Sequence, residues 1–205
     1  MARLGYGRKI FGAALTLLAL ACMTSAHAHT GSGLPSGFAL GFSHPFEGID
    51  HLLAMLCVGL WGAFLGRPLI YLLPITFPAM MVVGAAFGMA ALELPIPPIE
   101  QGVALSVCVL GACIAIAWRA PAWIALAIVA LFAVFHGYAH GMMLPSATAP
   151  VGYSAGFVLA TGLLHLGGIA LGALTRWRAG LVFARGAGAV IGAAGVWLLV
   201  QALCL

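Results

Sequence analysis

The chain consists of long apolar stretches separated by short turns that are rich in proline, glycine or arginine. About 20 apolar residues in a helix suffice to cross the hydrocarbon core of a bilayer, which is about 30 Å thick. By this measure the pattern predicts membrane spans near residues 39–65, 69–91, 99–118, 121–144, 151–174 and 182–204. We therefore expect an all-α polytopic membrane protein, a six-transmembrane-helix bundle whose short loops leave no room for a soluble domain.

The first 28 residues have the pattern of a secretory signal. Its parts are a basic start with Arg3, Arg8 and Lys9, the apolar stretch 10–21, and a cleavage motif at 26–28. We predict a cleavable N-terminal signal peptide at 1–28 and a single six-helix transmembrane domain at 29–205. The alternatives are an uncleaved first helix and, with a poor recognition motif, a lipoprotein signal that ends at Cys22.

Composition supports the membrane assignment and excludes nucleic acid as a partner. Hydrophobic residues make up 64% of the chain and charged residues 6%, whereas soluble proteins have about 25% charged residues. The formal net charge is +4, but the arginines form no basic patch with interleaved aromatic residues.

The charges instead predict the orientation of the spans. Arg67, Arg119, and Arg176 with Arg178 lie in loops one, three and five, whereas loop two carries Glu93 and Glu100. By the positive-inside rule, the arginine-bearing loops face the cytoplasm. The expected location is the bacterial inner membrane, with the mature N- and C-termini in the periplasm.

Glycines spaced by four residues recur along the predicted spans. They are the pairs Gly84/Gly88, Gly137/Gly141, Gly168/Gly172 and Gly188/Gly192. Small residues at this spacing let membrane helices approach closely, so we expect these glycines to serve helix packing.

Two short polar clusters interrupt the apolar pattern, at residues 44–51 and 135–141. An ionisable side chain at the bilayer centre costs about 2.5 to 3.5 kcal/mol on insertion scales, so such residues normally line a cavity, pair or bind a ligand. The two clusters contribute four imidazoles and a carboxylate, from His44, Asp50, His51, His136 and His140. This combination predicts a shared site for a divalent metal ion.

Helical geometry places part of the first cluster on one face. In a straight first span, Glu47, His51 and Met55 fall within about 80° of one another. Pro45 is expected to begin this helix and to leave His44 just outside it, because a residue before proline avoids the helical region.

The second cluster is expected to meet the first. His136 and His140 stand at positions i and i+4 of the fourth span, a spacing that suits two imidazoles on one ion. Because the first span runs inward and the fourth outward, both clusters lie within roughly 20 Å of the outer surface, from the rise of about 1.5 Å per residue.

Three further residues are candidates for secondary roles. Glu47 could attract cations to an outer vestibule. His165 in the fifth span could act as a deeper ligand or relay, or could simply hydrogen-bond to a neighbouring carbonyl. If the signal is cleaved, His29 and the new amine could chelate a metal ion at the periplasmic entrance.

The ligand types narrow the choice of ion. Imidazole with carboxylate suits Ni²⁺, Co²⁺, Zn²⁺ or Fe²⁺, whereas Ca²⁺ and Mg²⁺ require more oxygen ligands. The scattered cysteines form no metal-binding motif, and we expect them to be small apolar fillers. No prosthetic group is expected.

These motifs resemble those of the HupE/UreJ proteins, a family of small membrane permeases associated with nickel supply to hydrogenase and urease. The resemblance rests on His44-x5-Asp50-His51, on Phe135-His136-Gly137-x3-Gly141, and more loosely on residues 160–165. It implies six mature spans after a signal sequence and uptake of Ni²⁺ or Co²⁺ that depends on the histidines and the aspartate. Members often carry an acidic residue where this chain has Met143, which bears on metal preference.

The chain has no G-x-x-x-x-G-K-[ST] loop, so it does not use ATP itself. We expect a secondary permease or facilitator, not an enzyme, for Ni²⁺ or Co²⁺. The alternatives are an intramembrane zinc-dependent hydrolase acting on a lipid and a non-transporting metal sensor or accessory protein. Besides the ion and the bilayer, the expected partners are a second copy of the chain or maturation proteins of a nickel enzyme.

Overall fold

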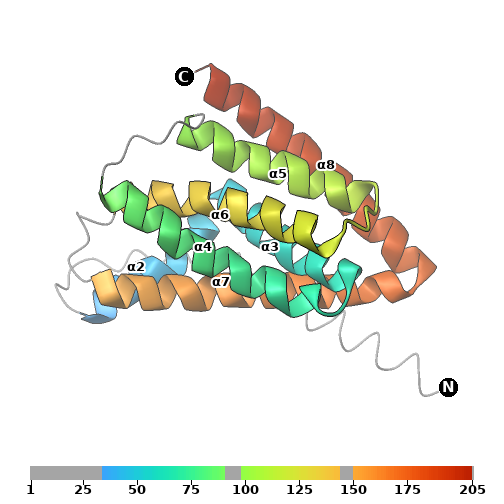
Figure 1. The fold of residues 1–205 in the computed structure, drawn as a ribbon, viewed down its shortest axis with the longest axis horizontal. Helices are drawn as coiled ribbons and strands as arrows, with labels where there is room; N and C mark the ends of the chain where they lie inside the picture. Colours follow the sequence, from blue (N-terminus) through green and yellow to red (C-terminus); the bar gives the residue numbers. More distant parts are fainter. Residues whose placement is uncertain (1–33, 91–97, 144–149, 205) are drawn as a thin grey trace. The chain divides into compact units, whose positions relative to one another are not determined.

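The structure, a computed structural model, describes residues 34–90, 98–143 and 150–204, and every regular element in these ranges is helical. The helices are α2 (Leu34–Glu47), α3 (Ile49–Leu65), α4 (Leu69–Met89), α5 (Ile99–Ala115), α6 (Ala122–Met143), α7 (Pro150–Ala173), the short 3-10 helix η2 (Leu174–Arg176) and α8 (Arg178–Leu203). Figure 1 shows their arrangement. The predicted signal peptide at 1–28 lies outside the described residues.

Within the described ranges, four helices are long and apolar enough to cross a membrane, namely α4, α6, α7 and α8. The bent pair of α2 and α3 would make a fifth span if it crosses as one unit, and α5 is a shorter apolar helix of 17 residues. The prediction of an all-helical membrane protein is thus confirmed. Its count of six spans stays a prediction.

The first predicted span is not a straight helix. α2 and α3 meet at Gly48 and are bent by 82°. Gly48 has an extended backbone, with φ −97° and ψ 115°, and α3 begins after it. The single straight face expected for Glu47, His51 and Met55 is therefore wrong, because Glu47 belongs to α2 and the other two residues to α3.

The expectation that Pro45 begins the helix is also wrong. α2 begins at Leu34 and contains both His44 and Pro45. A residue before proline is disfavoured in a helix, but this preference is weak beside tertiary packing. Here α2 packs along α7 over much of its length, which supports its helical conformation through Pro45.

The helices pack mainly in pairs. α4 lies against α6, α5 against α8, and α7 against both α2 and α3. α3 also contacts α4, α5 and α8, and its residues 54–62 are mostly buried, so it forms the centre of the described bundle. The start of this central helix carries Asp50 and His51.

The glycine pairs lie at these helix contacts, as predicted. A Cβ atom added at Gly137 would collide with the backbone carbonyl of Met81, and one at Gly84 with that of Val134, so α4 and α6 touch through their backbones. In the same way, Gly59 of α3 lies against the carbonyl of His165 of α7. These contacts hold α4 against α6, which carries His136 and His140, and α7 against α3, which carries His51.

We expect the Gly84→Ala variant to be less stable than the native protein by about 1 to 3 kcal/mol, because its methyl group overpacks the α4–α6 contact. Thermal unfolding in detergent should show a fall in Tm of several degrees. Gly186→Ala in α8 is the matched control, since nothing lies within 4 Å of the added Cβ. Equal Tm values for the two variants would contradict the close contact.

The outward faces of the helices suit a lipid environment. Large apolar side chains are exposed along the bundle, among them Val82 of α4, Trp123 of α6 and Val190 of α8. Such an apolar surface would be unfavourable in water and is favourable against acyl chains. The polar side chains of the two clusters are, by contrast, mostly turned into the bundle.

Candidate metal-binding site within the helix bundle

The bend at Gly48 brings two histidines of the first cluster together from different helices. His44 lies in the last turn of α2, and His51 lies in the first turn of α3. Their ring centroids are 6.0 Å apart. A straight helix would have separated these residues by almost two turns, so the break itself brings them close.

The second cluster meets the first, as predicted. His140 of α6 lies 4.8 Å from His44 and 4.9 Å from His51, measured between ring centroids. His136, one turn earlier on α6, lies 4.7 Å from His51. These four residues form a continuous group of imidazoles, which we call the histidine cluster. Three helices contribute to it, namely α2, α3 and α6.

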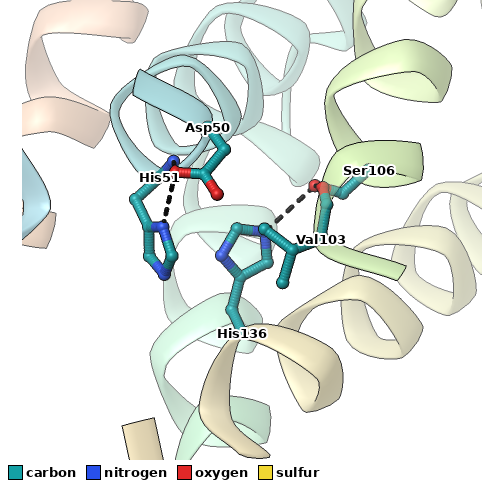
Figure 2. Close-up of polar contacts among 5 residues, drawn as sticks. All are labelled: Asp50, His51, Val103, Ser106 and His136. Atoms are coloured by element: carbon teal, nitrogen blue, oxygen red, sulfur yellow. Dashed lines mark hydrogen bonds and ion pairs between the residues drawn. The ribbon is translucent and has the colours of Figure 1, made fainter. Parts of the chain in front are cut away.

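Asp50 holds the ring of His51. The Oδ1 atom of Asp50 accepts hydrogen bonds from the backbone N–H and from Nδ1 of His51, each at 2.8 Å (Figure 2). An ionised carboxylate is only an acceptor, so Nδ1 of His51 carries the proton. The lone pair of this neutral imidazole therefore stands on Nε2.

Ser106 of α5 holds one ring nitrogen of His136, as Asp50 holds one of His51. Figure 2 shows its hydroxyl between the ring of His136 and the backbone of Val103. Ser106 Oγ donates its single proton to the carbonyl of Val103, so in its 3.0 Å contact with Nε2 of His136 it accepts. The lone pair of His136 is consequently on Nδ1. Sequence reasoning missed Ser106, because a lone serine in an apolar helix carries no signal of its own.

The cluster contains buried ring nitrogens without any hydrogen-bond partner. They are Nε2 of His51, Nδ1 of His136, and both ring nitrogens of His140. His136 is fully buried and His140 is 6% exposed. Unpaired polar atoms in an apolar interior are costly, since each lacks the hydrogen bonds it would have in water. A bound cation would satisfy Nε2 of His51, Nδ1 of His136 and the one nitrogen of His140 that carries the lone pair, because such nitrogens are good ligands for divalent transition metals.

Aromatic rings enclose the histidine cluster. Phe157 lies 4.5 Å from His140 and 6.3 Å from His44, between ring centroids. Tyr153, one turn earlier on α7, lies 5.9 Å from His44. Nothing in the sequence distinguishes these two residues, since aromatic side chains in a membrane span are ordinary. In the structure they lie against the rings of His44 and His140 from the side of α7.

Glu47 is the last residue of α2. Its side chain is exposed, and its Oε1 accepts a hydrogen bond of 2.8 Å from the hydroxyl of Ser43, one turn earlier on α2. No hydrogen bond or ion pair between Glu47 and a histidine ring is found among the described residues, although its charge lies close enough to act on His44. The carboxylate is thus placed near the cluster in sequence but oriented toward the surface.

His165 lies apart from the histidine cluster. It is 2% exposed and belongs to α7, and its ring centroid is 5.6 Å from that of Phe77 on α4. His165 forms a hydrogen bond with the backbone of Pro74. This bond agrees with the alternative that the sequence left open, a histidine bound to a neighbouring carbonyl.

Two residues named in the sequence analysis add nothing to this geometry. His29 lies outside the described residues, and Met143 ends α6 without a described side chain.

The cysteines that the structure describes are free, and Cys57 and Cys113 are buried among apolar side chains. This agrees with their expected role as fillers.

No three histidine, cysteine, aspartate or glutamate side chains in the described part of the chain are arranged as a metal site. His51 meets both His136 and His140 edge to face, with interplanar angles of 83° and 73°.

The fold and the site define a class of protein. This is a multi-pass membrane protein whose polar residues converge within a helix bundle. Comparison with known families gives the particular one: the model described as HupE / UreJ protein matches residues 16–198, so the chain belongs to the HupE/UreJ family. This family is associated with metal uptake that serves hydrogenase and urease.

A curated relative gives the same result. The protein named Protein HupE from Rhizobium leguminosarum bv. viciae is 41% identical over 185 residues, which cover 90% of this chain and 95% of the relative. No solved structure matches the chain. The family resemblance inferred from the two histidine motifs is thus confirmed.

Proposed function

We propose that this protein is a secondary permease that carries Ni²⁺, and also Co²⁺, inward across the bacterial inner membrane to supply hydrogenase or urease. The observation that carries the proposal is the histidine cluster, in which three imidazoles from α3 and α6 have buried ring nitrogens without partners. Membership in the HupE/UreJ family supports it. The proposed topology has six spans after a cleaved signal, with both mature termini in the periplasm.

The proposed ligands are His44, Asp50, His51, His136 and His140. His51 would bind through Nε2 and His136 through Nδ1, because their other ring nitrogens are held by Asp50 and Ser106. Asp50 contributes negative charge and fixes the orientation of His51. Since these side chains are not arranged as a metal site in the described structure, binding requires them to turn about their side-chain torsions. Glu47 and, after cleavage, His29 would attract the ion at the outer face.

The membrane potential is sufficient as a driving force. An ion of charge two that crosses 100 mV of inward-negative potential gains about 4.6 kcal/mol, which corresponds to roughly a thousandfold accumulation. Coupling to ATP is not required, in agreement with the absence of a nucleotide-binding loop from the sequence.

The test is uptake of radiolabelled Ni²⁺ by a nickel-transport-deficient bacterium that expresses the native chain. We expect uptake well above that of the empty vector, competition by Co²⁺, and loss of accumulation when a protonophore removes the membrane potential. Normal expression without uptake would refute the permease. Purified protein that retains zinc and hydrolyses lipid would then identify the hydrolase, and metal binding without either activity would identify a sensor or accessory protein.

A further inference from the structure

A second group of buried polar atoms lies on α7, outside the histidine cluster. Nε2 of His165 and Oγ1 of Thr161 are both buried and have no hydrogen-bond partner. The two side chains are 2% and 1% exposed. They stand at positions i and i+4 and therefore share one face of α7. Two unpaired polar atoms on one face indicate a place where a ligand binds, because leaving them unpaired is costly.

The ring of His165 is held by a backbone carbonyl of α4 that has no donor within its own helix. Residue 78 would normally donate its N–H to the carbonyl of residue 74, but Pro78 has no N–H. His165 bonds to the backbone of Pro74, and since proline offers only a carbonyl, the ring is the donor. Nε2 is unpaired, so the donor is Nδ1, and the lone pair stands on Nε2. His51 and His136 show the same division between a held nitrogen and a free one.

Phe77 lies between the two groups. Its ring centroid is 5.5 Å from that of His136 and 5.6 Å from that of His165, and its side chain is fully buried. Phe77 also lies between Pro74 and Pro78, where α4 lacks two backbone hydrogen bonds. The ring that separates the groups is thus attached to a part of α4 that lacks two of the backbone hydrogen bonds of a regular helix.

We propose that Thr161 and His165 form an inner transit site that takes the divalent cation from the histidine cluster when the Phe77 ring moves aside. The proposal rests on the permease function proposed above. One imidazole and one hydroxyl make a weak site for a cation that accepts nitrogen ligands, such as Ni²⁺ or Co²⁺. Weak binding suits a transit site, because conduction requires an ion to leave as readily as it enters.

The experiment separates binding from flux. Purified protein is reconstituted in liposomes, an inside-negative potential is imposed with potassium and valinomycin, and Ni²⁺ entry is measured beside equilibrium binding in detergent. His165→Asn places an amide donor near the position of Nδ1, so it can retain the bond to Pro74, but it removes Nε2. Thr161→Val removes the hydroxyl with little change in volume.

For both variants we expect Ni²⁺ flux to fall at least tenfold. The Kd of the histidine cluster for Ni²⁺ should stay within twofold of the native value, and the Tm within 3 °C. Thr175→Val is the matched control and should keep native flux, because the hydroxyl of Thr175 donates to the carbonyl of Gly172 outside the proposed site.

Native flux in His165→Asn and Thr161→Val would overturn the inner site. So would a loss of flux accompanied by a fall in Tm or in binding, since that result assigns a structural role. Absence of potential-driven flux in the native protein would instead refute the permease.

Discussion

Ni²⁺ binding and uptake are expected to fall by about a hundredfold when His51 or His136 is replaced by alanine. Each substitution removes one imidazole whose unpaired nitrogen faces the interior of the bundle. A hundredfold loss corresponds to about 2.8 kcal/mol, a plausible contribution for one ligand among several. Equilibrium dialysis of purified protein gives the loss of affinity, and uptake of radiolabelled Ni²⁺ by cells gives the loss of transport.

Met142→Ala is the matched control for this prediction. Met142 lies on α6 with the two histidines of the second cluster, but its side chain is 61% exposed at the surface of the bundle. Its replacement should leave binding and uptake close to the native values. If well-expressed His51→Ala and His136→Ala variants bind and transport like Met142→Ala, the histidine cluster is not the site.

The second large effect is expected for Asp50→Asn, with a tenfold to hundredfold loss of Ni²⁺ affinity. Asparagine keeps an oxygen that can accept from the backbone N–H of His51, so the start of α3 should be preserved. It lacks the negative charge that fixes the proton on Nδ1 of His51 and makes Nε2 a better ligand. Dialysis measures the affinity, and the absorption spectrum of bound Co²⁺ reports the ligands.

This prediction distinguishes two roles for the carboxylate. If Asp50 acts only by orienting His51, the Co²⁺ spectrum of Asp50→Asn at saturation should match that of the native protein. A changed spectrum would make Asp50 itself a ligand. Glu100→Gln, the same chemical change at an exposed position in the first turn of α5, should bind normally. An unchanged affinity for Asp50→Asn would exclude both roles.

The sequence was sufficient to find the helices and the residues that converge. Apolar stretches of membrane length predict helices because no other open structure satisfies its backbone polar groups in lipid. The cost of placing histidines at that depth points to a common site, and the short distances of His51 to His136 and to His140 agree with this. Signal cleavage, orientation and the count of six spans stay predictions.

The sequence did not reveal the features that depend on contacts between distant helices. The apolar pattern continues through Gly48, so nothing local signals the 82° bend between α2 and α3. Ser106 orients His136 across 30 positions of the chain, and its role follows only from the packing of α5 beside α6. Likewise, Pro78 matters to His165 because it frees a carbonyl on a neighbouring helix, which composition cannot show.

The packing of α2 on α7 has a consequence for biogenesis. α2 makes its main contacts with a helix that the ribosome produces after α3, α4, α5 and α6. The helix that carries His44 therefore lacks its main packing partner until α7 has been made, whereas α6, with His136 and His140, can pack on α4 as soon as it is inserted. The first histidine of the cluster to be synthesised thus belongs to the helix whose main packing partner is made last.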